Sequence, residues 1–100
     1  MKAEFTEFAS DSNWVSGTIG NFNFNAKLFD NGSTFGIQNG RVSKLSIWNQ
    51  KTRLITGSFF DACIVNYDRG WDIEPSNQTV ALTIFDAVMD LLENSPKRFE

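Results

Sequence analysis

The chain has 100 residues, of which 41% are hydrophobic and 21% charged, a balance typical of one folded domain rather than a disordered or fibrous chain. It contains no His and a single Cys, so the usual general base near neutral pH and the commonest metal ligand are missing. We therefore exclude serine-type triads, Cys–His nucleophiles, zinc sites and intrachain disulfides, and we expect neither a metal nor a cofactor.

The first third of the chain predicts a β-hairpin. Within residues 1–12, the three-residue spacing of Phe5 and Phe8 fits a short helix, but an added edge strand fits this segment equally well. From residue 13 to residue 29, apolar and polar residues alternate in two runs separated by Gly20-Asn21. An alternation of period two is typical of strands, and Gly-Asn is a turn signal.

The middle of the chain predicts more strands. Asn39-Gly40 is a strong signal for a two-residue hairpin turn, because both positions of that turn require a positive φ. In the strand that follows, the alternation is imperfect, since Val42 and Leu45 fall on opposite faces. This predicts either a β-bulge or a strand that is buried in part on both sides. A further turn is expected at residues 49–52. We expect strands over residues 34–38, 41–48, 53–60 and 63–67.

After Pro75 the apolar period changes from two residues to three or four, which predicts an amphipathic helix over residues 77–93. Ser76 or Asn77 can cap its first turn, and Pro96 ends it. The whole chain, residues 1–100, is thus expected to form one α+β domain. Its antiparallel meander of five or six strands lies within residues 13–72, with the C-terminal helix packed on one face.

Several strings of the chain resemble a family of small uncharacterised proteins of Gram-positive bacteria and their phages. The most specific strings are Gly-Arg-Val-Ser-Lys-Leu at residues 40–45 and Tyr-Asp-Arg-Gly-Trp-Asp at residues 67–72. The other strings lie at residues 14–19, 24–30 and 32–37. The resemblance implies a bacterial or phage setting in the cytoplasm, and it brings no activity, cofactor or ligand with it.

The string at residues 67–72 is the first candidate site. Asp68 to Gly70 is expected to form a tight turn that leaves Arg69 and Trp71 near the surface, and an exposed Trp beside an Arg is typical of a protein-binding hot spot. The structural alternative is that Trp71 packs on the fold while Asp68 and Asp72 bind turn amides or pair with Arg69. A carboxylate-based hydrolase using Asp68 and Asp72 is a third possibility.

The charge is unevenly distributed along the chain, and this gives a second candidate site. Residues 31–60 carry four cations and no acid, whereas the whole chain has a net charge of −3. Basic and aromatic residues together are typical of single-strand binders, although sheet edges also use cations to block pairing with other chains. The residues of this alternative nucleic-acid surface are Arg41, Lys44, Trp48, Lys51 and Arg53.

The predicted helix carries Asp86, Asp90 and Glu93 on one face. This acidic ridge is either its solvated side or a surface that meets a basic partner, including the basic segment of another copy. We therefore expect a cytoplasmic, non-enzymatic interaction protein without a membrane association. Its partner is expected to be a protein, including a second copy of itself, bound through the Asp68, Arg69, Trp71 and Asp72 loop, with nucleic acid as the alternative.

Overall fold

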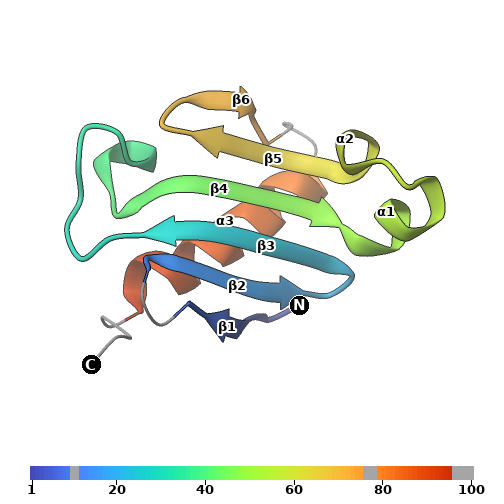
Figure 1. Ribbon diagram of the computed structural model, residues 1–100, viewed down its shortest axis with the longest axis horizontal. Helices are drawn as coiled ribbons and strands as arrows, with labels where there is room; N and C mark the ends of the chain where they lie inside the picture. Colours follow the sequence, from blue (N-terminus) through green and yellow to red (C-terminus); the bar gives the residue numbers. More distant parts are fainter. Residues whose placement is uncertain (10–11, 76–78, 96–100) are drawn as a thin grey trace.

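The computed structural model describes residues 1–9, 12–75 and 79–95. The strands form one antiparallel meander in the order β1-β2-β3-β4-β5-β6, and α3 crosses behind it (Figure 1). This confirms the predicted fold class. The elements are β1 Ala3–Phe8, β2 Trp14–Ile19, β3 Phe22–Leu28, the 3-10 helix Ile37–Asn39, β4 Val42–Asn49, α1 Gln50–Thr56, α2 Phe59–Ala62, β5 Cys63–Asp68, β6 Trp71–Ile73 and α3 Thr79–Asn94.

The hydrophobic core lies between the sheet and α3. Phe24, at the centre of β3, is 1% exposed, as expected of a sheet face that the helix covers, and Phe22 packs against the same core. From α3, the residues at three- and four-residue steps point into this layer, so the amphipathic pattern is confirmed. The buried residues of α3 are Ile84, Phe85, Val88 and Leu92. The predicted capping residues Ser76 and Asn77, and Pro96, lie outside the described residues.

The N-terminal segment forms an edge strand rather than a helix. β1 pairs antiparallel with β2, from Ala3 opposite Ile19 to Phe8 opposite Val15. The register shifts between Phe5 and Glu7, so a β-bulge interrupts this pairing. The short strand β1 thus forms one edge of the sheet.

The prediction of a strand over residues 34–38 followed by an Asn39-Gly40 turn is wrong. These residues belong to a long loop with one 3-10 turn, in which Gln38 and Asn39 have φ values of 54° and 60° and Gly40 is extended. Ile37 in this turn is 2% exposed because its side chain enters the core. Burial of this one side chain therefore holds the segment as a compact loop beside the sheet.

The prediction of a strand over residues 53–60 is also wrong, because α1 and α2 occupy this segment. Asn49 caps α1 by accepting a hydrogen bond from the Thr52 amide at 3.0 Å, and Gly57 ends it with a φ of 69°. Ser58 caps α2 in the same way through the Asp61 amide, at 3.3 Å. The local capping residues outweigh the β-rich composition of this segment.

The predicted β-bulge in the fourth strand is confirmed. Lys27 of β3 pairs with Lys44 of β4, but the next residue, Leu28, pairs with Val42. One extra residue, Ser43, is thus inserted into β4. This bulge shapes the end of the sheet where the candidate site lies.

Candidate functional site

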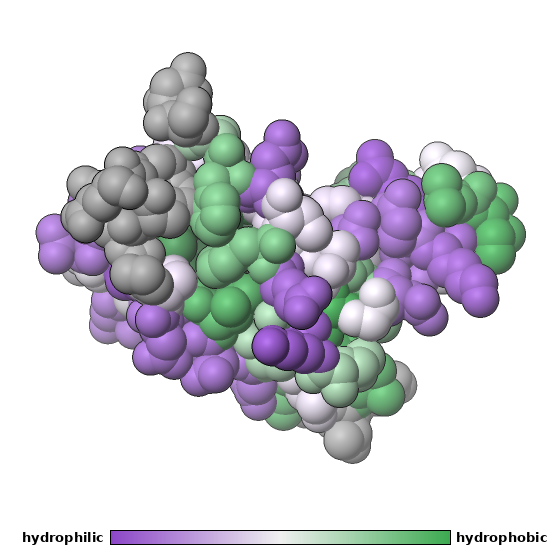
Figure 2. All heavy atoms as spheres, turned by 90° about the horizontal axis from the view of Figure 1, so that it is seen from below, coloured by the Kyte–Doolittle hydropathy of each residue, from purple (hydrophilic) through white to green (hydrophobic). Residues whose placement is uncertain are grey.

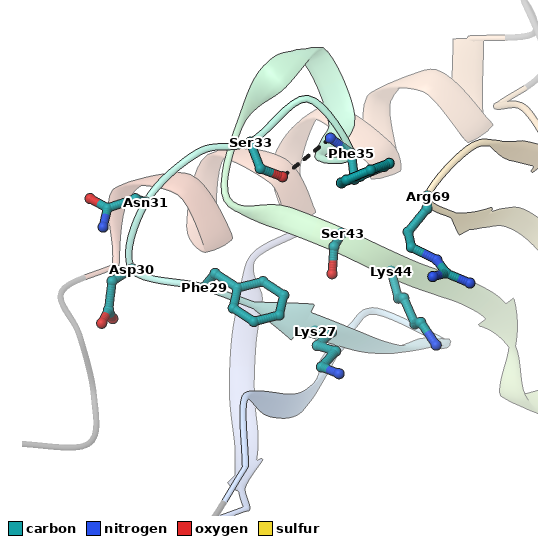
Figure 3. Close-up of a pocket in the computed structure, with 9 residues that line it drawn as sticks. All are labelled: Lys27, Phe29, Asp30, Asn31, Ser33, Phe35, Ser43, Lys44 and Arg69. Atoms are coloured by element: carbon teal, nitrogen blue, oxygen red, sulfur yellow. Dashed lines mark hydrogen bonds between the residues drawn. The ribbon is translucent and has the colours of Figure 1, made fainter.

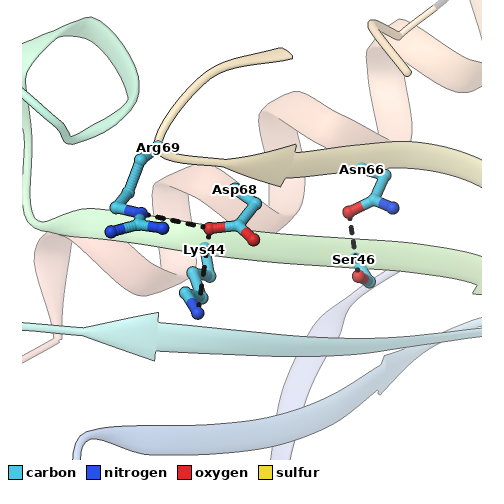
Figure 4. Close-up of polar contacts among 5 residues, drawn as sticks. All are labelled: Lys44, Ser46, Asn66, Asp68 and Arg69. Carbon is cyan, nitrogen blue, oxygen red and sulfur yellow. Dashed lines mark hydrogen bonds and ion pairs between the residues drawn. The ribbon is translucent and has the colours of Figure 1, made fainter. Parts of the chain in front are cut away.

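On the sheet face opposite α3, side chains form three rows across the strands, and residues of α1 and α2 contact the Trp48 end of this face. We call this surface the open face. The first row is Trp14, Lys27, Lys44 and Asp68, the second is Ser16, Asn25, Ser46 and Asn66, and the third is Thr18, Asn23 and Trp48. Figure 4 shows members of the first two rows in front of the sheet, with α3 behind. The face is polar and cationic, in contrast to the apolar face that α3 covers.

A pocket of about 560 Å³ opens at one end of this face (Figure 3). Three cations converge on it from three parts of the chain: Lys27 from β3, Lys44 from β4 and Arg69 from the turn between β5 and β6. Phe29 and Phe35, which are 37% and 60% exposed, supply its aromatic walls. We call this the basic pocket, and its lining residues are Lys27, Phe29, Asp30, Asn31, Ser33, Phe35, Ser43, Lys44 and Arg69.

The loop that carries Phe29 and Phe35 is held in place by a hydrogen bond from β5. The Tyr67 hydroxyl donates a hydrogen bond to the Phe35 carbonyl oxygen at 2.8 Å. The Phe35 amide in turn donates to the Ser33 hydroxyl at 3.2 Å. Asp30 lines the pocket from the same loop, with its carboxylate directed away from the three cations (Figure 3). The aromatic wall is thus held in position by the buried end of β5.

The three cations lie close together at an electrostatic cost. Lys27 and Lys44 are directly opposite each other on neighbouring strands, where like charges are destabilising. One carboxylate oxygen of Asp68 pairs with both neighbours, at 3.7 Å from Lys44 Nζ and 3.3 Å from Arg69 Nε (Figure 4). A single acid thus offsets two cations, and the local excess of positive charge favours an anionic ligand.

Backbone strain adds to this cost at Arg69. Its φ is 55°, in the left-handed region that costs a residue with a side chain about 1–2 kcal/mol. The neighbouring Gly70, which can adopt this conformation at little cost, does not have a positive φ. The Arg69 amide donates to the Ser43 carbonyl oxygen at 2.9 Å, which holds the turn against the bulge of β4. Strain of this kind is concentrated at functional sites.

Arg69→Asn is expected to stabilise the fold while weakening ligand binding. Asn adopts the left-handed conformation at lower cost, so we expect the free energy of unfolding to rise by up to about 1 kcal/mol. The exposed pair with Asp68 that is lost contributes little. Urea denaturation of both proteins tests the stability change, and a fall in stability would contradict this account of the turn.

The other end of the open face carries an aromatic and cationic stack. The Arg53 guanidinium lies 5.5 Å from the Trp48 ring centre and 5.3 Å from that of Phe59. Trp48 donates its indole N–H to Gln50 Oε1 at 2.7 Å. Two residues of the predicted nucleic-acid surface, Trp48 and Arg53, are thus brought together here, while Lys51 is exposed on α1 nearby.

Arg41, another residue of that predicted surface, has a structural position instead. Its guanidinium donates to the carbonyl oxygens of Leu92, Glu93 and Ser95 at 3.3, 3.1 and 2.8 Å, and so caps the end of α3. A fourth bond, from Nε to the Phe29 carbonyl oxygen, measures 2.8 Å. The Arg41 backbone amide donates to the Glu93 carboxylate. Glu93 therefore belongs to this contact at the end of α3 and not to the predicted acidic ridge.

The predicted Trp/Arg loop is divided between two sides of the molecule. Trp71 packs edge-to-face on Tyr67 and on Phe85 of α3, with ring centres 4.9 and 5.7 Å apart, and is 38% exposed. Asp68 and Arg69 lie instead on the side of the open face, and Asp72 is exposed on β6. The structure thus brings Asp68 and Arg69 of the predicted loop together with Lys44 of the predicted nucleic-acid surface. Sequence alone does not give the strand pairing. The residues that this pairing brings into the basic pocket, above all Lys27, were therefore not predicted.

Cys63 is a partly buried thiol that donates to the Val65 carbonyl oxygen at 3.1 Å. Burial raises its pKa above the ordinary value. Because the folded state retains the thiol proton longer than the unfolded state, stability is expected to fall as pH rises through the ordinary thiol pKa. We expect iodoacetamide to modify Cys63 at pH 8 more slowly than in urea, as measured by mass spectrometry. Equal rates would contradict the burial argument.

Two further classes of site were considered for the described residues. Among residues 1–9, 12–75 and 79–95, no three acidic or cysteine side chains are grouped so that they can hold a metal ion. In the same part of the chain, no helix has the length and apolar character needed to cross a membrane.

Comparison with known proteins identifies a family but no function. Residues 13–93 match the family described as "Domain of unknown function (DUF7678)". No curated protein and no solved structure matches the chain significantly. The matched region includes the basic pocket and all of the open face.

Proposed function

The chain belongs to the DUF7678 family over residues 13–93, and from its surface we propose that it is a non-enzymatic protein that binds single-stranded nucleic acid on the open face. The observation that supports this most strongly is the convergence of Lys27, Lys44 and Arg69 beside Phe29 and Phe35. Cations that track phosphates beside aromatic rings that stack bases are the two elements of single-strand recognition.

The phosphate contacts are assigned to the basic pocket. Lys27 and Lys44 repel each other across neighbouring strands, so a phosphate placed between them relieves a cost already present in the free protein. Arg69 adds a planar guanidinium with two-point hydrogen bonding to phosphate. Its side chain is 64% exposed and therefore accessible to a ligand.

Base contacts are assigned to the aromatic side chains around the open face. Phe29 and Phe35 flank the cations at one end, and Trp48 lies at the other. Between them lies the row of Ser16, Asn25, Ser46 and Asn66, whose side chains can hydrogen-bond base edges. A polar row between stacking platforms suits single strands with splayed bases.

The negative charge of the whole chain is compatible with this proposal, because some of the acids lie away from the basic pocket. Asp86 and Asp90 are exposed on α3, on the other side of the sheet from the basic pocket. The proposed contact is local and involves few cations, so we expect modest affinity and a strong dependence on salt. The proposed setting is the cytoplasm of Gram-positive bacteria or of their phage-infected cells, supported by the string resemblance at residues 40–45 and 67–72.

Fluorescence anisotropy with labelled oligonucleotides tests the proposal. We expect binding of a 12-nucleotide single strand at low ionic strength, weaker binding of a duplex of the same sequence, and loss of binding as salt rises. A poly-glutamate peptide of matched charge separates the nucleic-acid proposal from a protein partner. Binding of the peptide but not of the single strand would replace this proposal with an acidic protein partner.

A further inference from the structure

An apolar surface that the proposed function does not use lies at the outer end of α1 and α2. Leu54, Ile55 and Phe60 are 75%, 79% and 81% exposed. Figure 2 shows this lobe projecting beyond the body of the molecule, with hydrophobic surface at its outer end. Exposed clusters of large apolar side chains mark interaction sites. We call these three residues, together with the exposed Lys51 on the same helix as Leu54 and Ile55, the tip.

A concave acidic surface lies at the opposite end of the molecule. A groove of about 430 Å³ separates the 3-10 turn from the C-terminal half of α3. Met89 gives it a half-buried apolar side chain, and Asp86 and Asp90 supply exposed acids. Among the described residues, the side-chain ion pairs all involve Asp68, so no cation in that part of the chain neutralises these two acids.

The tip and the groove carry opposite charges, and each includes apolar side chains. One is convex, apolar and basic, and the other is concave, partly apolar and acidic. Because they lie at opposite ends of the longest dimension of the chain, 37 Å (Figure 1), a single chain cannot join them. We propose that the tip of one copy docks into the groove of a second copy, giving head-to-tail assembly along this axis.

The proposed contact is heterologous and weak. A heterologous contact that does not close into a ring produces an open chain of copies rather than a fixed dimer. Three apolar side chains bury less surface than the roughly 800 Å² per partner of a standard stable interface, so the association is weak and depends on concentration. The inference rests on the tip and the groove alone, so it does not depend on the nucleic-acid proposal.

Sedimentation equilibrium with two complementary variants tests the inference. Leu54→Asn/Ile55→Asn removes the tip, and Asp86→Lys/Asp90→Lys reverses the groove charge; all four positions are exposed, and circular dichroism checks their folding. We expect the average mass of the wild type to rise with concentration and each variant alone to stay monomeric. An equimolar mixture is expected to stop at two chains, because it contains one intact tip and one intact groove.

Three results would overturn the inference. A wild type that stays monomeric up to its solubility limit rejects self-association. Association of the groove variant alone points to tip-to-tip contact instead. A mixture that stays monomeric while the wild type associates shows that the tip and the groove are not partners.

Discussion

Replacing both Lys27 and Lys44 with Gln is expected to weaken single-strand binding by about tenfold or more at low salt. The slope of log K against log salt is expected to become shallower by about 1.4, since each lost phosphate contact contributes about 0.7 for single strands. Stability is expected to stay the same or to rise slightly, because the directly opposed like charges are removed. Anisotropy titrations at several salt concentrations measure both the affinity and the slope.

The matched control is Lys2→Gln/Lys51→Gln, which changes the net charge by the same amount. Both of these lysines are exposed and neither lines the basic pocket. We expect this control to keep most of the affinity of the wild type. If the two double variants lose affinity equally, binding depends on net charge alone and the basic pocket is not the site.

Arg41→Ala is expected to lower the free energy of unfolding by about 2–3 kcal/mol, because a charged donor that serves several partly buried carbonyl groups is lost. The guanidinium joins the end of α3 to the Phe29 carbonyl oxygen, so its removal frees both the helix end and the loop. For a chain of this size the melting temperature is expected to fall by roughly 10–20 °C. Calorimetry or thermal circular dichroism measures the change.

Two further variants separate this structural role from a ligand contact. Arg41→Lys keeps the charge but lacks the planar fork, so we expect it to recover less than half of the lost stability. Lys51→Ala is expected to change stability by less than about 0.5 kcal/mol, as is usual at exposed positions. An Arg41→Ala protein of unchanged stability and weaker single-strand binding would return Arg41 to the ligand surface.

Local sequence patterns predicted those parts of the fold in which local and tertiary preferences agree. The alternation over residues 13–29 and the three- and four-residue period after residue 79 each match the face that is buried. The bulge was detectable because Val42 and Leu45 are both core residues that one continuous strand cannot place on the same face. In these segments the hydrophobic period alone specifies the element.

Two segments were mispredicted because a specific local or tertiary contact outweighed composition. Residues 53–60 contain several β-formers, but the caps at Asn49 and Ser58 and the left-handed Gly57 favour two short helices. The capping residues can be recognised in the sequence. They were overlooked because Leu54 and Ile55, which are exposed, give this segment the apolar composition of a strand. Around Asn39-Gly40, the burial of Ile37 decided the conformation, and no local signal reports that contact.

The candidate site was predicted only in fragments, since it depends on which strands are neighbours. Lys44, Asp68 and Arg69 were each identified, but in two separate sites, and the pairing of β4 with β5 brings them together. Lys27 joins them through the pairing of β3 with β4. Arg41 and Trp71 have the residue types of binding groups, yet hydrogen bonds and ring packing assign them to the fold.

The central claim is that the open face binds a single strand, and an amide chemical-shift titration tests it most directly. With a 12-nucleotide single strand added to isotope-labelled protein, we expect the largest changes at the basic pocket, at Lys27, Lys44 and Arg69, and in the row of Ser46 and Asn66. The outer surface of α3, including Asp86, is expected to change little. Changes centred on α3 or on the tip, or none at low salt, would contradict the proposed function.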